Sequence, residues 1–424
     1  MNSPGLKLFT LAGFLSLVAP SNAQTRPAPS LTISATPNQI LLSWPTNYTG
    51  FALESANSLV APISWVPQTN GINTSGSNWL FTVSASTATA FYRLQSFRLS
   101  GAIIASPLTW TWVPFDNCFC MEGSTTGIGI NLNTNSSKVL IYLLGGGACW
   151  DYTTCYVLNT AVHGPFQQPE FDAAVPQLNQ AWFFDRTSAT NVFKDYSYVI
   201  VPYCTGDLYA GSQVNLYQNN VTMQVGFLNM AAHLLRLVPT FPSVERVVLA
   251  GSSAGGYGAT FNWLQTQMAF GNVRVDVIDD SGPILTPDVL AHGFPIFLPG
   301  SEPVTNWDFN AVLPSVCASC ATNVSSLYGF IASSAPAHRL ALLSYTQDQT
   351  IRTYLGLSAV QFNDGLNELA AAEFNPYADL AYFFVSGQSH VLLQTPALSV
   401  NGVTLQQFIT QMETDDPAWS SQHP

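Results

Sequence analysis

The chain has 424 residues, more than an ordinary single domain holds, so we expect a large core and an accessory module. Its formal net charge is −12 at pH 7, which repels nucleic-acid phosphates and anionic lipid, so neither class of partner is expected. Only 8% of the residues are charged and 12% are aromatic, a profile that favours a folded protein with many loops over a disordered chain.

The N-terminus has the pattern of a secretory signal peptide. An apolar run from Leu8 to Ala19 follows Lys7, and Ser21-Asn22-Ala23 provides a small-x-small cleavage site. The run is shorter than the roughly 20 residues that a spanning helix needs. We therefore expect residues 1–23 to be removed and the protein to be secreted, extracellular or periplasmic, without membrane insertion.

Residues 24–97 are predicted to form a small β-sandwich that serves as an accessory module. Turn residues separate short alternating or aromatic runs, and no helical period interrupts them. The pattern resembles the fibronectin-type-III-like modules of bacterial secreted enzymes. Such a module could bind a surface, and it contains no catalytic constellation. The runs are Leu31 to Ala35, Ile40 to Trp44, Phe51 to Ser55, Trp79 to Val83 and Phe91 to Leu94.

Residues 98–424 are predicted to form an α/β-hydrolase-like domain with a mostly parallel sheet flanked by helices. Near-continuous apolar runs are typical of strands that are covered on both faces, and helical stretches alternate with them. The predicted strands are 138–144, 197–201, 246–250, 273–278, 340–345 and 381–385, and the predicted helices include 223–238, 256–270 and 358–374.

The strongest motif is Gly251-Ser252-Ser253-Ala254-Gly255, which lies between the strand 246–250 and the helix 256–270. This is a G-x-S-x-G pattern in the setting that a nucleophile elbow requires: a tight turn that exposes the serine hydroxyl at the positive end of a helix. A plain serine-glycine turn is the alternative. We identify Ser253 as the candidate nucleophile.

A serine hydroxyl needs a base, and imidazole is the usual one. His390 follows the strand 381–385 through a short loop, at a carboxyl end of the sheet and downstream of the nucleophile, as the α/β-hydrolase order demands. It is the preferred base. The remaining histidines are interpreted as surface or structural residues: His163, His233, His292, His338 and His423.

The triad acid should follow a strand between Ser253 and His390. Asp348 follows the strand 340–345, whereas Asp279 and Asp280 end the strand 273–278. We favour Asp348, because its strand precedes the helix and strand that lead to His390. Asp280 is interpreted as a structural carboxylate that accepts backbone N–H groups in its own turn.

An ester hydrolase also needs donors for the developing oxyanion. Gly145-Gly146-Gly147 closes the strand 138–144, where hydrolases of this class carry the second donor. The backbone amides of Gly146 or Gly147, together with that of Ala254, are predicted to form the oxyanion hole. No Gly-Lys-Ser/Thr follows the glycines, so they are not a phosphate loop.

Seven cysteines in an exported chain favour disulfides over a zinc site. We expect a local Cys317–Cys320 bridge. Cys149 and Cys155 are close enough in sequence to close a loop, and Cys118 or Cys120 could reach Cys204. At least one cysteine stays unpaired.

Five segments in order resemble the pectin acetylesterase and Notum family of serine carboxylesterases. The likeness covers roughly residues 100–412. By resemblance, Ser253 is the nucleophile, Asp348 the acid and His390 the base, no cofactor is used, and acyl groups are removed from carbohydrate or protein-bound serine. The segments are Leu144 to Trp150, Pro202 to Asp207, Gly251 to Gly256, Asp280 to Gly282 and Ser389-His390.

The expected function is hydrolysis of carboxylic esters through an acyl-enzyme, with an acetylated polysaccharide such as pectin as the leading substrate. The family often has a large aromatic residue where this chain has Ala148, and the acidic net charge opposes a polyanionic substrate. A polyester or lipid esterase is the first alternative. A binding protein without catalysis on the same fold is the second.

Overall fold

The computed structural model describes residues 29–36, 38–46, 51–58, 65–68, 71–84, 90–96, 101–294, 296–334 and 338–424. The predicted signal peptide, residues 1–23, and the predicted domain boundary at residues 97 and 98 lie outside the described residues.

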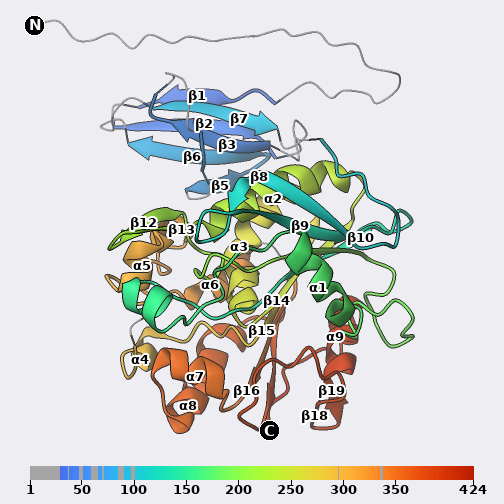
Figure 1. Cartoon of the computed structure of the whole chain (residues 1–424). Coiled ribbons are helices and arrows are strands. Elements are labelled where there is room, and N and C mark those ends of the chain that lie inside the picture. Colours follow the sequence, from blue (N-terminus) through green and yellow to red (C-terminus); the bar gives the residue numbers. More distant parts are fainter. Residues whose placement is uncertain are drawn as a thin grey trace, which may run out of the picture.

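Two small antiparallel sheets form the N-terminal part of the chain, drawn in blue in Figure 1. One sheet has the order β1-β2-β6-β5 and the other β4-β3-β7. They share a small core of Leu42, Trp44, Leu53, Ile72 and Phe81. All five predicted strands are present, and short strands β4 and β5 were not predicted. The strands are β1 (Thr32–Ala35), β2 (Gln39–Pro45), β3 (Phe51–Ala56), β4 (Val66–Pro67), β5 (Ile72–Ser75), β6 (Asn78–Ser84) and β7 (Phe91–Ser96).

The rest of the chain is built on one large sheet with the order β17-β16-β15-β14-β10-β11-β9-β8. Strands β11, β10, β14, β15, β16 and β17 are parallel, and the hairpin β8–β9 joins antiparallel at the edge beside β11. The predicted α/β-hydrolase-like fold class is therefore correct. The strands are β8 (Thr111–Phe119), β9 (Thr125–Asn131), β10 (Lys138–Leu143), β11 (Ser197–Val201), β14 (Arg246–Ser252), β15 (Arg274–Asp280), β16 (Leu340–Tyr345) and β17 (Leu380–Val385).

The strands are apolar along their whole length because both faces of the sheet are covered. On β10, Val139, Ile141 and Leu143 belong to one buried cluster, and Leu140 and Tyr142 to the other. This alternation follows from the two-residue period of a strand. Helices α2, α3, α6 and α8 contribute to the first cluster, and α1 and α9 to the second.

The helices match the sequence patterns with shifted ends. The predicted helix 223–238 begins later, since residues 223 and 224 belong to β13, and the predicted helix 358–374 divides into α8 and a π-helical turn at Ala370–Phe374. The α-helices are α1 (Gln168–Leu178), α2 (Gly226–Thr240), α3 (Ala254–Phe270), α4 (Pro287–Leu290), α5 (Glu302–Asn306), α6 (Ser326–Ser334), α7 (Gln349–Leu355), α8 (Ala359–Leu369) and α9 (Leu405–Glu413). Two small hairpins complete the fold: β12 (Gln213–Tyr217) with β13 (Asn220–Gln224), and β18 (Ser399–Val400) with β19 (Val403–Thr404).

Three disulfides are present, and they agree with the predicted pairings. Cys317 bonds to Cys320, and Cys149 bonds to Cys155. Cys120, rather than Cys118, pairs with Cys204. Cys118 is free and buried, and burial raises the pKa of its thiol to about 12. A thiol with so high a pKa carries little reactive thiolate near neutral pH.

His233 of α2 is a buried histidine with an acid-sensitive environment. Its side chain packs edge-on against Phe115 at 4.8 Å between ring centroids, and neither ring nitrogen has a hydrogen-bond partner among the residues that the structure describes. Burial lowers the pKa of His233 from 6.5 to about 3. The His233 imidazole is therefore protonated at a higher pH in the unfolded chain than in the folded chain. The stability that neutral His233 retains above pH 6.5 is lost as the pH falls toward 3.

We expect His233→Leu to reduce acid sensitivity. Between pH 7 and pH 4, the wild-type free energy of unfolding should fall by about 3 kcal/mol more than that of the variant, because each pH unit below 6.5 costs about 1.4 kcal/mol. Urea unfolding at both pH values measures the difference. His292→Gln is the control, since His292 is exposed. Equal losses in wild type and His233→Leu would contradict the expectation.

Candidate active site

Ser253 occupies a strained turn between β14 and α3. Its φ is 59°, a region that side-chain-bearing residues seldom adopt. The turn is tight because Gly251 and Gly255 touch: a Cβ on Gly251 would lie 2.1 Å from the Gly255 carbonyl oxygen. The Ser253 N–H donates to the Asp280 carbonyl oxygen at 2.7 Å. The predicted strand-turn-helix setting of the G-x-S-x-G motif is therefore present.

Asp348 and His390 are joined by a hydrogen bond. The Asp348 Oδ2 lies 2.7 Å from His390 Nδ1, and its Oδ1 accepts from the Ile351 N–H at 3.0 Å, which caps α7. Asp348 is fully buried, and the His390 side chain is 23% exposed. A buried carboxylate thus fixes the orientation of an imidazole that a substrate can still reach.

Ser253 and His390 lie at the carboxyl edge of the same sheet, after β14 and β17. No hydrogen bond joins Ser253 Oγ to the imidazole among the described contacts of these two residues. Both segments are instead bonded to Asp280-Ser281: Ser253 N–H to the Asp280 carbonyl, and Val391 N–H to Ser281 Oγ at 3.2 Å. Catalytic hydrogen bonds are often long before a substrate binds, so this geometry remains compatible with a triad.

Asp280 has a different environment from the one predicted. Its carboxylate does accept backbone N–H groups, but they come from Leu392 at 2.7 Å and Leu393 at 3.1 Å rather than from its own turn. Asp280 therefore fastens the loop that carries His390. Asp279 points elsewhere, accepting from the Thr260 and Tyr328 hydroxyls.

A buried hydroxyl chain leads to Asp280. Tyr142 donates to Ser252 Oγ at 2.7 Å, and Ser252 donates to Asp280 Oδ2 at 2.6 Å. Burial raises the pKa of Asp280, while the hydrogen bonds from Ser252, Leu392 and Leu393 and the nearby His390 oppose this change. Burial and the Asp280 charge also raise the pKa of Tyr142, so its phenol stays protonated and can donate.

The glycine run lies against the elbow. Gly147 has φ of 79°, and a Cβ there would lie 2.1 Å from the Thr160 carbonyl oxygen, so only glycine fits. Gly147 and Ala254 line the same cavity as Ser253. Gly146 does not line it, and its carbonyl accepts from the Val162 N–H at 2.7 Å. Of the two predicted glycine donors, Gly147 is the one beside the cavity.

The cavity beside Ser253 is small and largely apolar. It offers about 30 Å³ to the centres of water-sized atoms. The sequence did not predict its walls, which come from segments far apart in the chain. They are Leu208, Tyr257, Ile296, Phe297, Ile351, Tyr354 and Leu355, together with Ala148.

Within the part of the chain that the structure describes, no cluster of three or more His, Cys, Asp or Glu residues could hold a metal ion. No helix there is long and apolar enough to span a bilayer.

Known proteins resemble this region in sequence. Residues 108–292 match the family model described as Pectinacetylesterase. Palmitoleoyl-protein carboxylesterase NOTUM of Schmidtea mediterranea is 31% identical over 148 residues, which are 34% of this chain and 28% of that protein. The Mus musculus protein of the same name is 24% identical over 177 residues, 38% of this chain and 33% of its own length. The alignments thus span about a third or less of these relatives.

The fold also has a solved counterpart. The solved structure of the Wnt deacylase Notum from Drosophila matches this fold with a TM-score of 0.50 and 15% sequence identity, covering 74% of this chain and 95% of that chain. Residues 108–292 therefore resemble the pectinacetylesterase family in sequence, part of the chain is similar to the Notum carboxylesterases, and the large sheet with its helices has an α/β-hydrolase-like fold.

Proposed function

We propose that this protein hydrolyses carboxylic esters through an acyl-enzyme, with Ser253 as nucleophile, His390 as base and Asp348 as acid. The observation that carries the proposal is the 2.7 Å hydrogen bond from His390 to buried Asp348 at the same sheet edge as the strained Ser253 turn. A carboxylate that orients an imidazole beside a serine elbow is the arrangement that acyl transfer requires.

The reaction divides into acylation and deacylation. Ser253 Oγ attacks the ester carbonyl while His390 Nε2 takes its proton, and the imidazolium then returns that proton to the leaving alcohol. Asp348 holds Nδ1–H and stabilises the imidazolium. The N–H groups of Ala254 and of Gly147 or Gly146 stabilise the oxyanion. Water, activated by His390, then releases the acid and regenerates Ser253.

The size of the cavity favours a short acyl group. The cavity offers about 30 Å³ to the centres of water-sized atoms, which leaves room for only a few heavy atoms of an acyl group. An acetyl group meets this limit, and a long fatty acyl chain does not. The apolar walls suit a methyl group. We therefore favour removal of acetyl groups, with an acetylated polysaccharide such as pectin as substrate.

Export from the cell is part of the proposal. Three disulfides are typical of proteins that fold in oxidising compartments, and the N-terminal sequence has the signal-peptide pattern. An extracellular or periplasmic enzyme would meet polymeric carbohydrate there.

A long-chain esterase is the second candidate, because the relatives in sequence are palmitoleoyl-protein carboxylesterases. Turnover of 4-nitrophenyl esters separates the two. We expect acetate to be the best substrate and octanoate to be at least about 100-fold worse in kcat/KM, since an acyl chain that cannot enter the cavity forfeits several kcal/mol. Equal or better turnover of octanoate would favour the long-chain alternative.

Enlarging the cavity should change this preference. Ile296 is 5% exposed and lines the cavity, so Ile296→Ala should raise the butyrate-to-acetate ratio of kcat/KM by about tenfold. Val289→Ala is the matched control, since Val289 is 7% exposed and lies outside the lining. If both variants keep the wild-type ratio, Ile296 does not limit the acyl group.

A further inference from the structure

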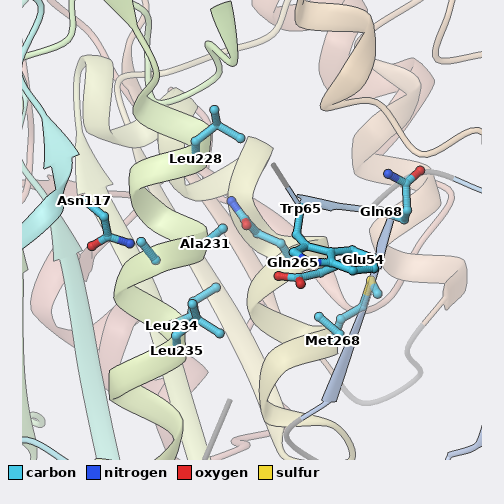
Figure 2. A pocket seen from close by; sticks show the side chains of 12 residues that line it. Glu54, Trp65, Gln68, Asn117, Leu228, Ala231, Leu234, Leu235, Gln265 and Met268 are labelled. Carbon is cyan, nitrogen blue, oxygen red and sulfur yellow. The ribbon is translucent and has the colours of Figure 1, made fainter. Parts of the chain in front are cut away.

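A second and larger cavity lies between the N-terminal sheets and the helices of the catalytic domain. It offers about 270 Å³ to the centres of water-sized atoms, roughly nine times the cavity beside Ser253. Figure 2 shows Leu228, Ala231 and Leu234 on helix α2 facing a group that includes Trp65 and Glu54. We call it the module groove. Its remaining lining residues are Ala52, Gln68, Asn117, Ala232, Leu235, Gln265 and Met268.

The module groove is separate from the proposed active site. Gln265 follows Ser253 by twelve positions on α3, which corresponds to roughly 18 Å along the helix axis. The two cavities share no lining residue. A ligand in the groove would therefore not contact the reacting serine.

Trp65 provides an aromatic surface that the fold holds in position. The Arg93 guanidinium lies 4.2 Å from the centroid of the Trp65 ring, and Arg93 Nε donates to Glu54 Oε2 at 2.7 Å. Arg93 does not line the groove, whereas Trp65 and Glu54 do. Arg93 thus supports the ring from outside the cavity and leaves part of the ring to face the interior.

The polar lining is rich in hydrogen-bond acceptors. Glu54 is 7% exposed, and the Gln68 Nε2 already donates to Ser55 Oγ at 2.8 Å. Gln265 Nε2 likewise donates within the protein, to Phe227 O at 3.2 Å. These side chains offer a ligand the Glu54 carboxylate and two amide oxygens, and Asn117, which also lines the groove, adds an exposed amide group. Among the described residues, no lysine or arginine lines the groove.

We propose that the module groove binds a neutral saccharide. A sugar ring has an apolar face that packs on an aromatic ring and on aliphatic side chains, and its hydroxyls donate to carboxylate and amide oxygens. The wall formed by Leu228, Ala231 and Met268 supplies aliphatic contact opposite the polar side chains. A uronate would bring a second carboxylate to a groove whose neighbouring cation, Arg93, is already paired with Glu54, so we expect like-charge repulsion to weaken its binding.

Titration calorimetry on the full-length mature protein tests this proposal. The probes are neutral hexasaccharides of glucose, mannose and xylose, and a hexagalacturonate of equal length. At least one neutral probe should bind, the hexagalacturonate at least tenfold more weakly, and Trp65→Ala should weaken the neutral probe at least tenfold. Ala231→Trp, which fills the groove from α2 and keeps Trp65, should do the same.

Val66→Ala is the matched control, because Val66 adjoins Trp65, is 48% exposed and lies outside the lining. Thermal unfolding of each variant checks the fold, and turnover of a small soluble ester should be unchanged in all three. The proposal is overturned if no neutral probe binds, if binding survives in both groove variants, or if the hexagalacturonate binds as tightly. Ester turnover is measured separately, so none of these three results bears on the proposed ester hydrolysis.

Discussion

Replacing Ser253 by alanine should lower ester turnover by at least roughly 10³-fold, to the residual rate that the oxyanion donors and binding alone provide. Without the hydroxyl, no acyl-enzyme forms, and His390 has no proton to remove. Turnover of 4-nitrophenyl acetate measures the loss. A fluorophosphonate should label the wild type and leave the variant unlabelled.

The fold should survive this substitution. Alanine is smaller than serine, and the backbone N–H that donates to the Asp280 carbonyl remains. Alanine, like serine, has a Cβ, so the substitution does not relieve the backbone strain at φ of 59°. The thermal midpoint should therefore change little. Ser252→Ala is the informative neighbour, because it removes the buried link to Asp280 and Tyr142 but leaves the nucleophile in place. Wild-type turnover in a stable Ser253→Ala protein would refute the proposed function.

The central sheet could be predicted because strands that are buried on both faces are continuous apolar runs in the sequence. Residues 197–201 and 340–345 are continuous apolar runs, and β11 and β16 begin and end at those residues. The edge hairpin β8–β9 was not predicted, because its strands do not form continuous apolar runs. Strand β8 contains Pro114 and polar residues, and β9 contains Gly129, where a Cβ would lie 2.2 Å from the Phe171 ring of α1. That glycine makes room for a tertiary contact, which local patterns do not record.

Only those residues of the candidate site that follow the ends of predicted strands could be predicted. Ser253, Asp348 and His390 each follow a predicted parallel strand, and such strands end at one edge of the sheet. The cavity walls could not be predicted in this way. Ile296 comes from a segment without helical or strand periodicity, and Tyr354 from a short helix after Asp348, so only the folded chain brings them beside Ser253.

The role of Asp280 was half predicted. Its position at the end of β15 indicated a structural carboxylate, and its side chain does accept hydrogen bonds from buried groups. The partners could not be foreseen, because Leu392 and Leu393 lie more than a hundred residues downstream. Burial of a carboxylate requires compensating donors, and the loop that carries His390 supplies them.

The two carboxylates should respond differently to replacement by asparagine. In Asp348→Asn, the side-chain oxygen can still accept from the Ile351 N–H, and asparagine is as good an N-cap as aspartate, so the fold should persist. The amide NH₂ would then face His390 Nδ1 in place of Oδ2 and stabilise the wrong tautomer. Turnover should fall by roughly 10³–10⁴-fold with the thermal midpoint nearly unchanged.

The two carboxylate oxygens of Asp280 accept hydrogen bonds from the Ser252 hydroxyl and from the N–H groups of Leu392 and Leu393. In Asp280→Asn, only one of these oxygens remains. The new NH₂ must therefore face at least one buried donor, which costs about 1–3 kcal/mol of stability. We expect a lower thermal midpoint and a smaller loss of turnover than in Asp348→Asn, because His390 keeps its acid. Denaturation and initial rates on both purified variants decide the assignment. A stable but inactive Asp280→Asn protein beside an active Asp348→Asn protein would reverse the roles of the two carboxylates.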